Sequence, residues 1–210
     1  MASEPNVETG PEIGKAKAVV ILAHGRGGSA ADMSALAGRL DRPGIRFISI
    51  AAPGGSWYPN SFLAAPESNE PRQSRALAQY EAAVAAALAA GVPLSKLILG
   101  GFSQGACLTM GLLWRTPRRY GAALVFTGGL IGPPGTAWEP RPRLAGLPVL
   151  LTNGDPDPFV PLSRSEETRR ALEASGARVS YHIHQGRPHA ICDDELVRAR
   201  TLLDEVADAP

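Results

Sequence analysis

Residues 94–115 read LSKLILGGFSQGACLTMGLLWR, and this stretch decides the fold class. The apolar run 94–99 predicts a buried strand, and the apolar residues spaced along 104–115 predict a helix directly after it. Between them, GFSQG at 101–105 fits the G-x-S-x-G pattern of a nucleophile elbow. Side chains next to the serine would collide in so tight a turn, which explains the glycines. The stretch therefore predicts Ser103 as a nucleophile at a strand-to-helix junction.

The rest of the chain repeats this alternation of short apolar strands and amphipathic helices. Strands are predicted at 17–23, 45–51, 122–127, 147–152 and 178–183, and helices at 29–40, 74–90, 163–176 and 193–206. The alternation predicts an α/β fold with a mostly parallel central sheet and helices on both faces. We interpret residues 17–210 as a single domain and the polar residues 1–16 as a disordered lead-in.

Composition excludes several classes of partner. With 21 basic and 20 acidic residues the net charge is +1, so we expect neither nucleic-acid binding nor stable membrane association. No apolar stretch approaches the roughly 20 residues that span a bilayer. The two cysteines show no metal-ligand spacing, so we expect no metal site, and they fit a cytoplasmic protein.

Glycine and proline are unusually frequent, at 23 and 19 of 210 residues, against a usual share of about 12 %. Much of this surplus falls in loops after predicted strands, including two long ones at 53–72 and 128–146. These are the only sizeable insertions, so we expect no large cap domain. Their apolar side chains are predicted to line a substrate site: Trp57, Tyr58, Phe62 and Leu63 in the first loop, and Leu130, Ile131 and Trp138 in the second.

A nucleophilic serine needs a base, and four histidines compete for that role. His24 ends the first strand and precedes the serine, whereas the partners of an elbow serine follow it in the chain. His182 and His184 lie two residues apart in a predicted strand, a spacing that places both on one sheet face and favours a structural role. His189 lies in the loop after the last strand and can reach over the strand ends. We therefore predict His189 as the base.

The remaining catalytic parts are an acid and an oxyanion hole. The loop after strand 147–152 offers Asp155 and Asp157, and spacing alone leaves both open. For the oxyanion hole we predict the backbone N–H of Gln104, which follows the nucleophile, and that of Arg26 in the loop after the first strand. A phosphate-binding loop at 24–28 is excluded because neither glycine-rich phosphate pattern is present.

With these residues assembled, the chain resembles the phospholipase/carboxylesterase family of α/β-hydrolases, which includes the acyl-protein thioesterases. The resemblance covers about residues 19–203 and rests on His24-Gly25, residues 96–106, 154–161 and 186–191. It implies Ser103 as nucleophile, His189 as base and Asp157, rather than Asp155, as the acid. It also implies the amides of Arg26 and Gln104 as oxyanion donors.

The resemblance implies a minimal serine carboxylesterase that hydrolyses small to medium esters through an acyl-enzyme on Ser103. Such a reaction requires no metal or organic cofactor. Where the thioesterase branch has a leucine and a Gly-Asp pair, this chain has Arg26-Gly27-Gly28, which is closer to bacterial carboxylesterases. The alternatives are an acyl thioesterase or lysophospholipase and, from another class, a non-catalytic ligand-binding member of the fold. The expected partners are a small-molecule ester and a second copy in a homodimer, since small members are often dimers.

Overall fold

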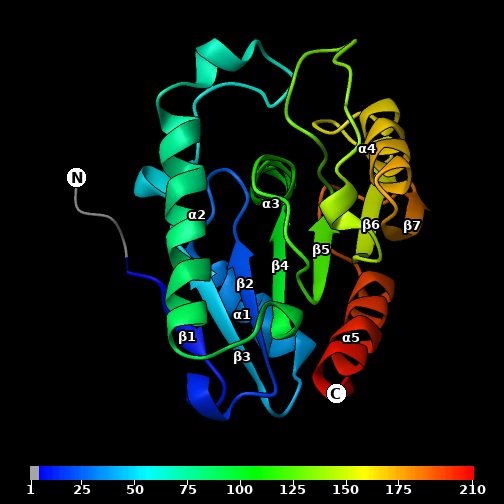
Figure 1. The fold of residues 1–210 in the computed structure, drawn as a ribbon. Helices are drawn as coiled ribbons and strands as arrows, with labels where there is room; N and C mark the ends of the chain where they lie inside the picture. Colours follow the sequence, from blue (N-terminus) through cyan, green and yellow to red (C-terminus); the bar gives the residue numbers. More distant parts are fainter. Residues whose placement is uncertain (1–4) are drawn as a thin grey trace.

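The computed structural model describes residues 5–210, whose strands form one sheet (Figure 1). The strands are β1 Val7–Thr9, β2 Ala18–Ala23, β3 Ile45–Ile50, β4 Leu97–Phe102, β5 Ala122–Phe126, β6 Pro148–Asp155 and β7 Arg178–Gln185. Their order is β1-β3-β2-β4-β5-β6-β7. Only the β1–β3 pair is antiparallel in the described chain, so the predicted mostly parallel sheet is confirmed.

Helices cover both faces of the sheet, as predicted. They are α1 Ala30–Leu40, α2 Arg72–Ala89, α3 Gln104–Arg115, α4 Leu162–Ala174 and α5 Asp193–Asp208. Short 3₁₀ helices lie at Ile13–Lys15, Pro53–Gly55, Pro66–Asn69, Leu94–Lys96 and Pro142–Leu144. Helices α1 and α5 pack on one face and α2, α3 and α4 on the other. Within residues 5–210 no helix is both long and apolar enough to cross a bilayer.

The central strand β2 shows why the sequence buries both faces. Val19 and Ile21 point into the core beneath α2 and α3, and Val20 and Leu22 point into the core beneath α1 and α5. All four are fully buried, and each such aliphatic side chain contributes about 1.5–3 kcal/mol by leaving water. A strand that is apolar at every position is therefore stable only between two helix layers.

The strand register aligns the carboxyl ends at one edge. Ala23 of β2 is paired with Gly101 of β4, whose neighbour Phe102 is paired with Phe126 of β5. Phe126 is in turn paired with Thr152 of β6. The segments that leave these strands therefore start side by side, which is where ligand sites form in open α/β sheets.

The predicted lead-in is partly ordered, which corrects the sequence interpretation of residues 1–16. Residues 1–4 lie outside the described part. Val7–Thr9 form β1, which pairs with β3 so that Thr9 lies opposite Phe47, and Glu8 forms an ion pair with Arg46. A polar strand suits this place because one that covers only a sheet edge needs backbone hydrogen bonds more than apolar side chains.

Several other element boundaries differ from the prediction by a few residues. The strand predicted at 94–99 begins later, because Leu94–Lys96 form a 3₁₀ turn and β4 continues to Phe102 through two glycines. The helix predicted at 163–176 begins at Leu162 with Pro161 as its N-cap residue, which has no side-chain cap bond. Ser29 caps α1 in a reciprocal pair with Asp32.

Candidate active site

Ser103 stands at the turn between β4 and α3 with φ 53° and ψ −117°, which is rare for a residue with a side chain. Its backbone N–H donates to the carbonyl of Phe126 at 3.0 Å. A Cβ on Gly101 would lie 2.5 Å from the Gly105 carbonyl carbon, and one on Gly105 would lie 2.0 Å from the Ala23 oxygen. Only glycine fits both positions, so the sequence forces this turn geometry.

The structure brings Ser103, His189 and Asp157 into one hydrogen-bonded chain. His189 Nε2 lies 2.9 Å from Ser103 Oγ, and His189 Nδ1 lies 2.8 Å from Asp157 Oδ2. The other Asp157 oxygen accepts hydrogen bonds from the backbone N–H of Phe159 at 3.0 Å and Val160 at 2.9 Å. With the carboxylate as acceptor, Nδ1 carries the proton and Nε2 is free to accept one from the serine.

Asp157 is held ionised by its contacts. Burial opposes its charge, but hydrogen bonds from His189 and from the amides of Phe159 and Val160 outweigh that effect and hold the pKa of the carboxyl below its usual range. The alternative acid, Asp155, points elsewhere: its Oδ2 accepts from Gln185 Nε2 at 3.3 Å. The structure thus places Asp157, and not Asp155, beside the imidazole.

The imidazole of His189 lies between two aromatic rings. The Phe102 ring is centred 5.0 Å away and the Phe159 ring 4.8 Å away, the latter edge-on. Phe159 is 65 % exposed, so its ring covers the imidazole from the solvent side. These rings restrict rotation of His189 and leave its Nε2 facing Ser103.

A buried ion pair supports the loop that carries the imidazole. Arg187 donates through Nη2 to Thr127 Oγ1 at 2.6 Å, and its Nε lies 3.7 Å from a carboxylate oxygen of Glu195. Glu195 is fully buried and also accepts hydrogen bonds from Thr152 Oγ1 and the backbone N–H of Cys192. The contacts join the ends of β5 and β6 to α5, so the loop between β7 and α5 is anchored at its base.

The two predicted oxyanion donors lie at the same cavity as Ser103. Neither the Arg26 nor the Gln104 backbone N–H has an acceptor among residues 5–210, and that of Gln104 opens the positive end of α3. The Gln104 side chain accepts from the Trp57 N–H at 2.9 Å and donates to the Tyr58 carbonyl at 2.7 Å. The Gln104 side chain therefore fixes the neighbouring loop, while the backbone N–H of Gln104 stays free to act as an oxyanion donor.

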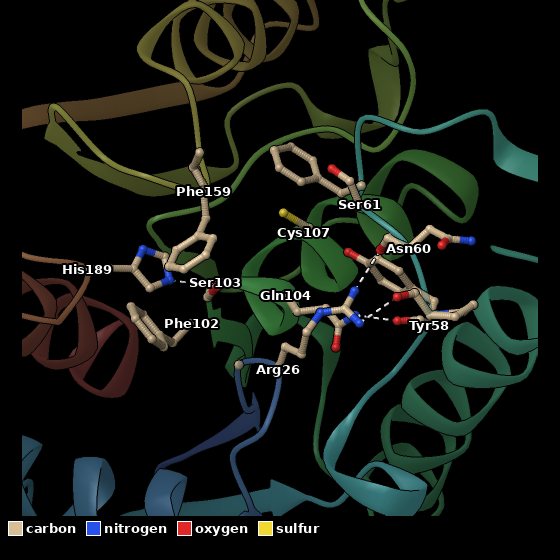
Figure 2. Close-up of a pocket in the computed structure, with 14 residues that line it drawn as sticks. Arg26, Tyr58, Asn60, Ser61, Phe102, Ser103, Gln104, Cys107, Phe159 and His189 are labelled. Atoms are coloured by element: carbon tan, nitrogen blue, oxygen red, sulfur yellow. Dashed lines mark hydrogen bonds between the residues drawn. The ribbon is translucent and has the colours of Figure 1, made fainter. Parts of the chain in front are cut away.

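A cavity of about 410 Å³ opens beside Ser103 (Figure 2). It is lined by Gly25, Arg26, Tyr58, Pro59, Asn60, Ser61, Phe62, Phe102, Ser103, Gln104, Cys107, Phe159, Val160 and His189. Half of these residues are apolar or aromatic, Tyr58 and Cys107 included. Burial raises the pKa of the Cys107 thiol to about 12, so this thiol stays neutral and does not compete with Ser103 as a nucleophile.

The predicted apolar lining is only partly correct. Tyr58 and Phe62 line the cavity, whereas Trp57 lies behind it and donates through Nε1 to the His24 carbonyl at 2.8 Å. Leu63 is not among the lining residues and packs on the core. The second loop does not reach the cavity, because Leu130, Ile131 and Trp138 border a separate depression beside α3.

Packing explains where the second loop goes. Ile131 fits against Gly111, which leaves room for it on α3, and the Trp138 ring meets Trp114 edge-on at 6.1 Å. Arg164 of α4 donates to the carbonyls of Leu130 and Gly132 at 2.8 and 2.7 Å. The loop is therefore fixed to α3 and α4.

Several lining residues were not predicted. They are Pro59, Asn60, Ser61, Phe102, Cys107, Phe159 and Val160, together with the backbone of Gly25. Three carried a usable signal: Phe102 is the residue before the serine, Cys107 is one helical turn after it, and Phe159 follows the acid in the same loop. No local pattern marked the others.

The other histidines have structural contacts. His24 is buried, donates through Nδ1 to the Gly25 carbonyl at 2.7 Å and accepts through Nε2 from the Ala52 N–H at 2.9 Å. His182 Nε2 lies 2.8 Å from Ser180 Oγ. Neither residue is bonded to Ser103, in agreement with the choice of His189 from chain order.

One group of side chains in residues 5–210 has the composition of a metal site. Ligand atoms of His184, Cys192 and Glu195 lie within 4.8 Å of one another. Both Glu195 oxygens already accept hydrogen bonds from the protein, and the Arg187 guanidinium is 3.7 Å away. That positive charge disfavours a cation beside Glu195, whose contacts serve the loop anchor described above.

The comparisons with known proteins fit this geometry. A family model described as Phospholipase/Carboxylesterase matches residues 5–207. The chain belongs to the phospholipase/carboxylesterase family. The chain therefore has the α/β-hydrolase fold, and its family is one of hydrolases.

Individual relatives cover almost the whole chain. An acyl-protein thioesterase 1 from Eremothecium gossypii is 29 % identical over 93 % of this chain and 92 % of its own. The crystal structure of a phospholipase/carboxylesterase from Dyadobacter fermentans is 38 % identical, with a TM-score of 0.87, and covers 94 % of this chain and 95 % of its own. The crystal structure of esterase PE8 is 27 % identical, with a TM-score of 0.74, over 96 % and 98 % of the two chains.

Proposed function

We propose that the protein is a serine carboxylesterase that hydrolyses small to medium carboxylic esters through an acyl-enzyme on Ser103. The observation that carries this proposal is the chain of hydrogen bonds from Ser103 Oγ through His189 to Asp157 at the edge of the cavity. A serine, a base and an orienting acid in this arrangement are the parts that nucleophilic acyl transfer needs.

In the first half-reaction His189 Nε2 takes the proton of Ser103 Oγ as the oxygen attacks the ester carbonyl carbon. The carbonyl oxygen becomes an oxyanion that accepts hydrogen bonds from the amides of Arg26 and Gln104, each worth roughly 10²–10³ in rate. His189 then gives the proton to the departing alcohol oxygen, and Ser103 is left acylated. Asp157 holds the imidazolium in place throughout.

In the second half-reaction water repeats the sequence. His189 takes a proton from the water as its oxygen attacks the acyl carbon, and returns the proton to Ser103 Oγ as the acid departs. The apolar lining, with Tyr58, Phe62 and Val160, suits an aliphatic or aromatic group. A cavity of about 410 Å³ suits small to medium substrates.

An acyl thioesterase is the second candidate. The acyl-protein thioesterase 1 of Eremothecium gossypii, which matches most of this chain, favours it. The same Ser103, His189 and Asp157 would act on a thioester, so the candidates differ only in the leaving group and chain length. A lysophospholipase differs in the same way, and a non-catalytic binding protein would have no use for the strained Ser103.

The experiment is hydrolysis of 4-nitrophenyl butyrate by the wild type and by Ser103→Ala. We expect kcat to fall by roughly 10⁴-fold or more in the variant, with an unchanged thermal unfolding profile as a control for folding. Hydrolysis that survives in Ser103→Ala would refute the nucleophile. A panel of oxygen esters and thioesters of two to sixteen carbons, compared by kcat/KM, separates the two candidates.

A further inference from the structure

Arg26 determines the charge of the cavity. Among its lining residues Arg26 is the only lysine or arginine, and none is an aspartate or glutamate. Asp157, the acid bonded to His189, is fully enclosed and does not line the cavity. An arginine is permanently charged, so a ligand in this cavity meets a positive charge that no lining acid balances.

The guanidinium of Arg26 is held by neutral acceptors. It donates through Nη1 to Ser56 Oγ at 3.3 Å and the Pro59 carbonyl at 2.7 Å, and through Nη2 to the Asn60 carbonyl at 2.6 Å. Within residues 5–210 no carboxylate lies within 4.0 Å of it. The three bonds orient the group and leave its charge uncompensated.

Two of its five N–H donors remain without a protein acceptor in the described chain: Nε–H and one on Nη2. Two donors on one guanidinium are what a carboxylate or phosphate uses in a bidentate contact. The side chain is exposed, so an anion can reach it.

The charge lies at a defined place relative to the reacting atoms. In Figure 2 the Arg26 guanidinium points toward Tyr58 and Asn60, on the side of the cavity away from His189. The same loop is held from behind by Arg72, which donates to the carbonyls of Pro53 and Ser56 at 3.1 and 2.6 Å. The end of the cavity opposite the base is therefore electropositive.

We propose that the Arg26 side chain forms an anion subsite, so that the preferred ester carries a carboxylate or phosphate on the part that lies away from His189. The inference rests on the proposed esterase function and adds the chemical class of the substrate. The competing explanation gives Arg26 a structural role alone, in which its side chain only fixes the loop at residues 56–60.

The first test compares two esters of equal chain length, the anionic 4-nitrophenyl hydrogen adipate and the neutral 4-nitrophenyl hexanoate. In the wild type we expect kcat/KM for the adipate to exceed that for the hexanoate by about fivefold or more. The ratio should fall to about 1 in Arg26→Gln and stay above 1 in Arg26→Lys, which keeps the charge. Arg119→Gln, which removes an exposed arginine that does not line the cavity, should leave the ratio unchanged.

The ratio separates the two explanations. If Arg26 only fixes the loop, Arg26→Gln lowers both rates together and the ratio stays the same, which overturns the proposal. A wild-type ratio of 1 or less also overturns it. Hydrolysis of the neutral ester in that case shows that the esterase function stands without the anion subsite.

A binding measurement makes the test independent of turnover. In the Ser103→Ala background both esters stay intact, and calorimetry should give a dissociation constant about fivefold lower for the adipate than for the hexanoate. Adding Arg26→Gln should remove this difference. Equal affinities in Ser103→Ala would contradict the subsite even if the wild type hydrolyses neither ester.

A third pair distinguishes the two anions. Hydrolysis of 1-butyrylglycerol 3-phosphate and of neutral 1-butyrylglycerol is followed by the acid released. A preference for the phosphate that depends on Arg26, in addition to the preference for the adipate, shows that the subsite also takes a phosphate on the alcohol part. A preference confined to the adipate assigns it to a carboxylate on the acyl part, and a preference in neither pair overturns the proposal.

Discussion

Ser103 has a backbone conformation that glycine adopts more easily, at φ 53° and ψ −117°. Such strain costs about 1–3 kcal/mol and persists only where the surroundings enforce it. Here the Ser103 N–H is held by Phe126, and the two flanking glycines pack against backbone. Thr127, at the end of the neighbouring strand, also has a positive φ of 55°. Strain thus collects at the strand ends beside the reacting group.

Ser103→Gly should therefore stabilise the protein while abolishing hydrolysis. We expect the free energy of unfolding to rise by about 1 kcal/mol relative to Ser103→Ala, because glycine adopts this backbone without strain. Both variants lack the nucleophile, so urea unfolding of the pair isolates the backbone effect. Equal stability of the two variants would show that the turn is not strained.

Asp157 gives a pH-dependent contribution to stability. Its pKa is lower in the folded protein than the usual value of 3.8, so the contribution is complete above that value and is lost as the pH falls through the lowered pKa. The wild type should exceed Asp157→Asn in unfolding free energy by more at pH 6 than at pH 3, as measured by urea unfolding.

The same experiment in a His189→Ala background is the control. Removing the imidazole removes the hydrogen bond that does most to lower the pKa of Asp157, so the difference between pH 6 and pH 3 should shrink. If the difference in unfolding free energy between the wild type and Asp157→Asn were the same at pH 6 and pH 3, the pKa of Asp157 would not be lowered.

At the scale of elements, the elbow joins β4 to α3 and presses α3 against the end of β2. A Cβ on Gly105 would meet the Ala23 oxygen at 2.0 Å and the His24 oxygen at 2.6 Å, and both are backbone atoms. Gly105→Ala should therefore lower the unfolding free energy by about 1–3 kcal/mol or more and displace Ser103 from His189.

A helix glycine provides the matched control. Gly38 in α1 has open space around its Cβ position, so Gly38→Ala should raise the unfolding free energy by about 0.5–1 kcal/mol. Thermal and urea unfolding measure both variants. An unfolding free energy of Gly105→Ala equal to that of the wild type would contradict the close approach of α3 to β2.

The elements differ in how far the sequence predicts them. The elbow was predictable because its glycines, the strand before it and the helix after it all carry local patterns, and His189 followed from chain order. The path of the loop at 128–146 was not predictable, because it depends on Gly111 and Arg164, which lie far from the loop in the sequence. β1 was missed because the edge of β3, rather than its own apolar content, makes it a strand.

At the scale of the whole molecule, the site is assembled from segments that the sheet brings together at one edge. Arg187 and Glu195 connect these segments, since their contacts reach β5, β6 and α5. Their side chains are 5 % and 0 % exposed. The position of His189 therefore depends on a charge pair that lies beneath it.

Arg187→Met should lower the unfolding free energy by about 3–5 kcal/mol, because it leaves the Glu195 charge buried without its partner. The double variant Arg187→Met/Glu195→Gln should be more stable than Arg187→Met alone, since it buries no unpaired charge. Urea unfolding of the wild type and the two variants measures this coupling. A double variant that is less stable than the single one would contradict the pairing.

The central claim is that Ser103, activated by His189, forms a covalent bond with the substrate acyl group. A fluorophosphonate probe followed by peptide mass spectrometry tests it most directly. We predict one adduct, on Ser103, that is absent from Ser103→Ala and forms at least about 10²-fold more slowly in His189→Ala. An adduct at another residue, or none in a protein that still hydrolyses 4-nitrophenyl butyrate, would contradict the account.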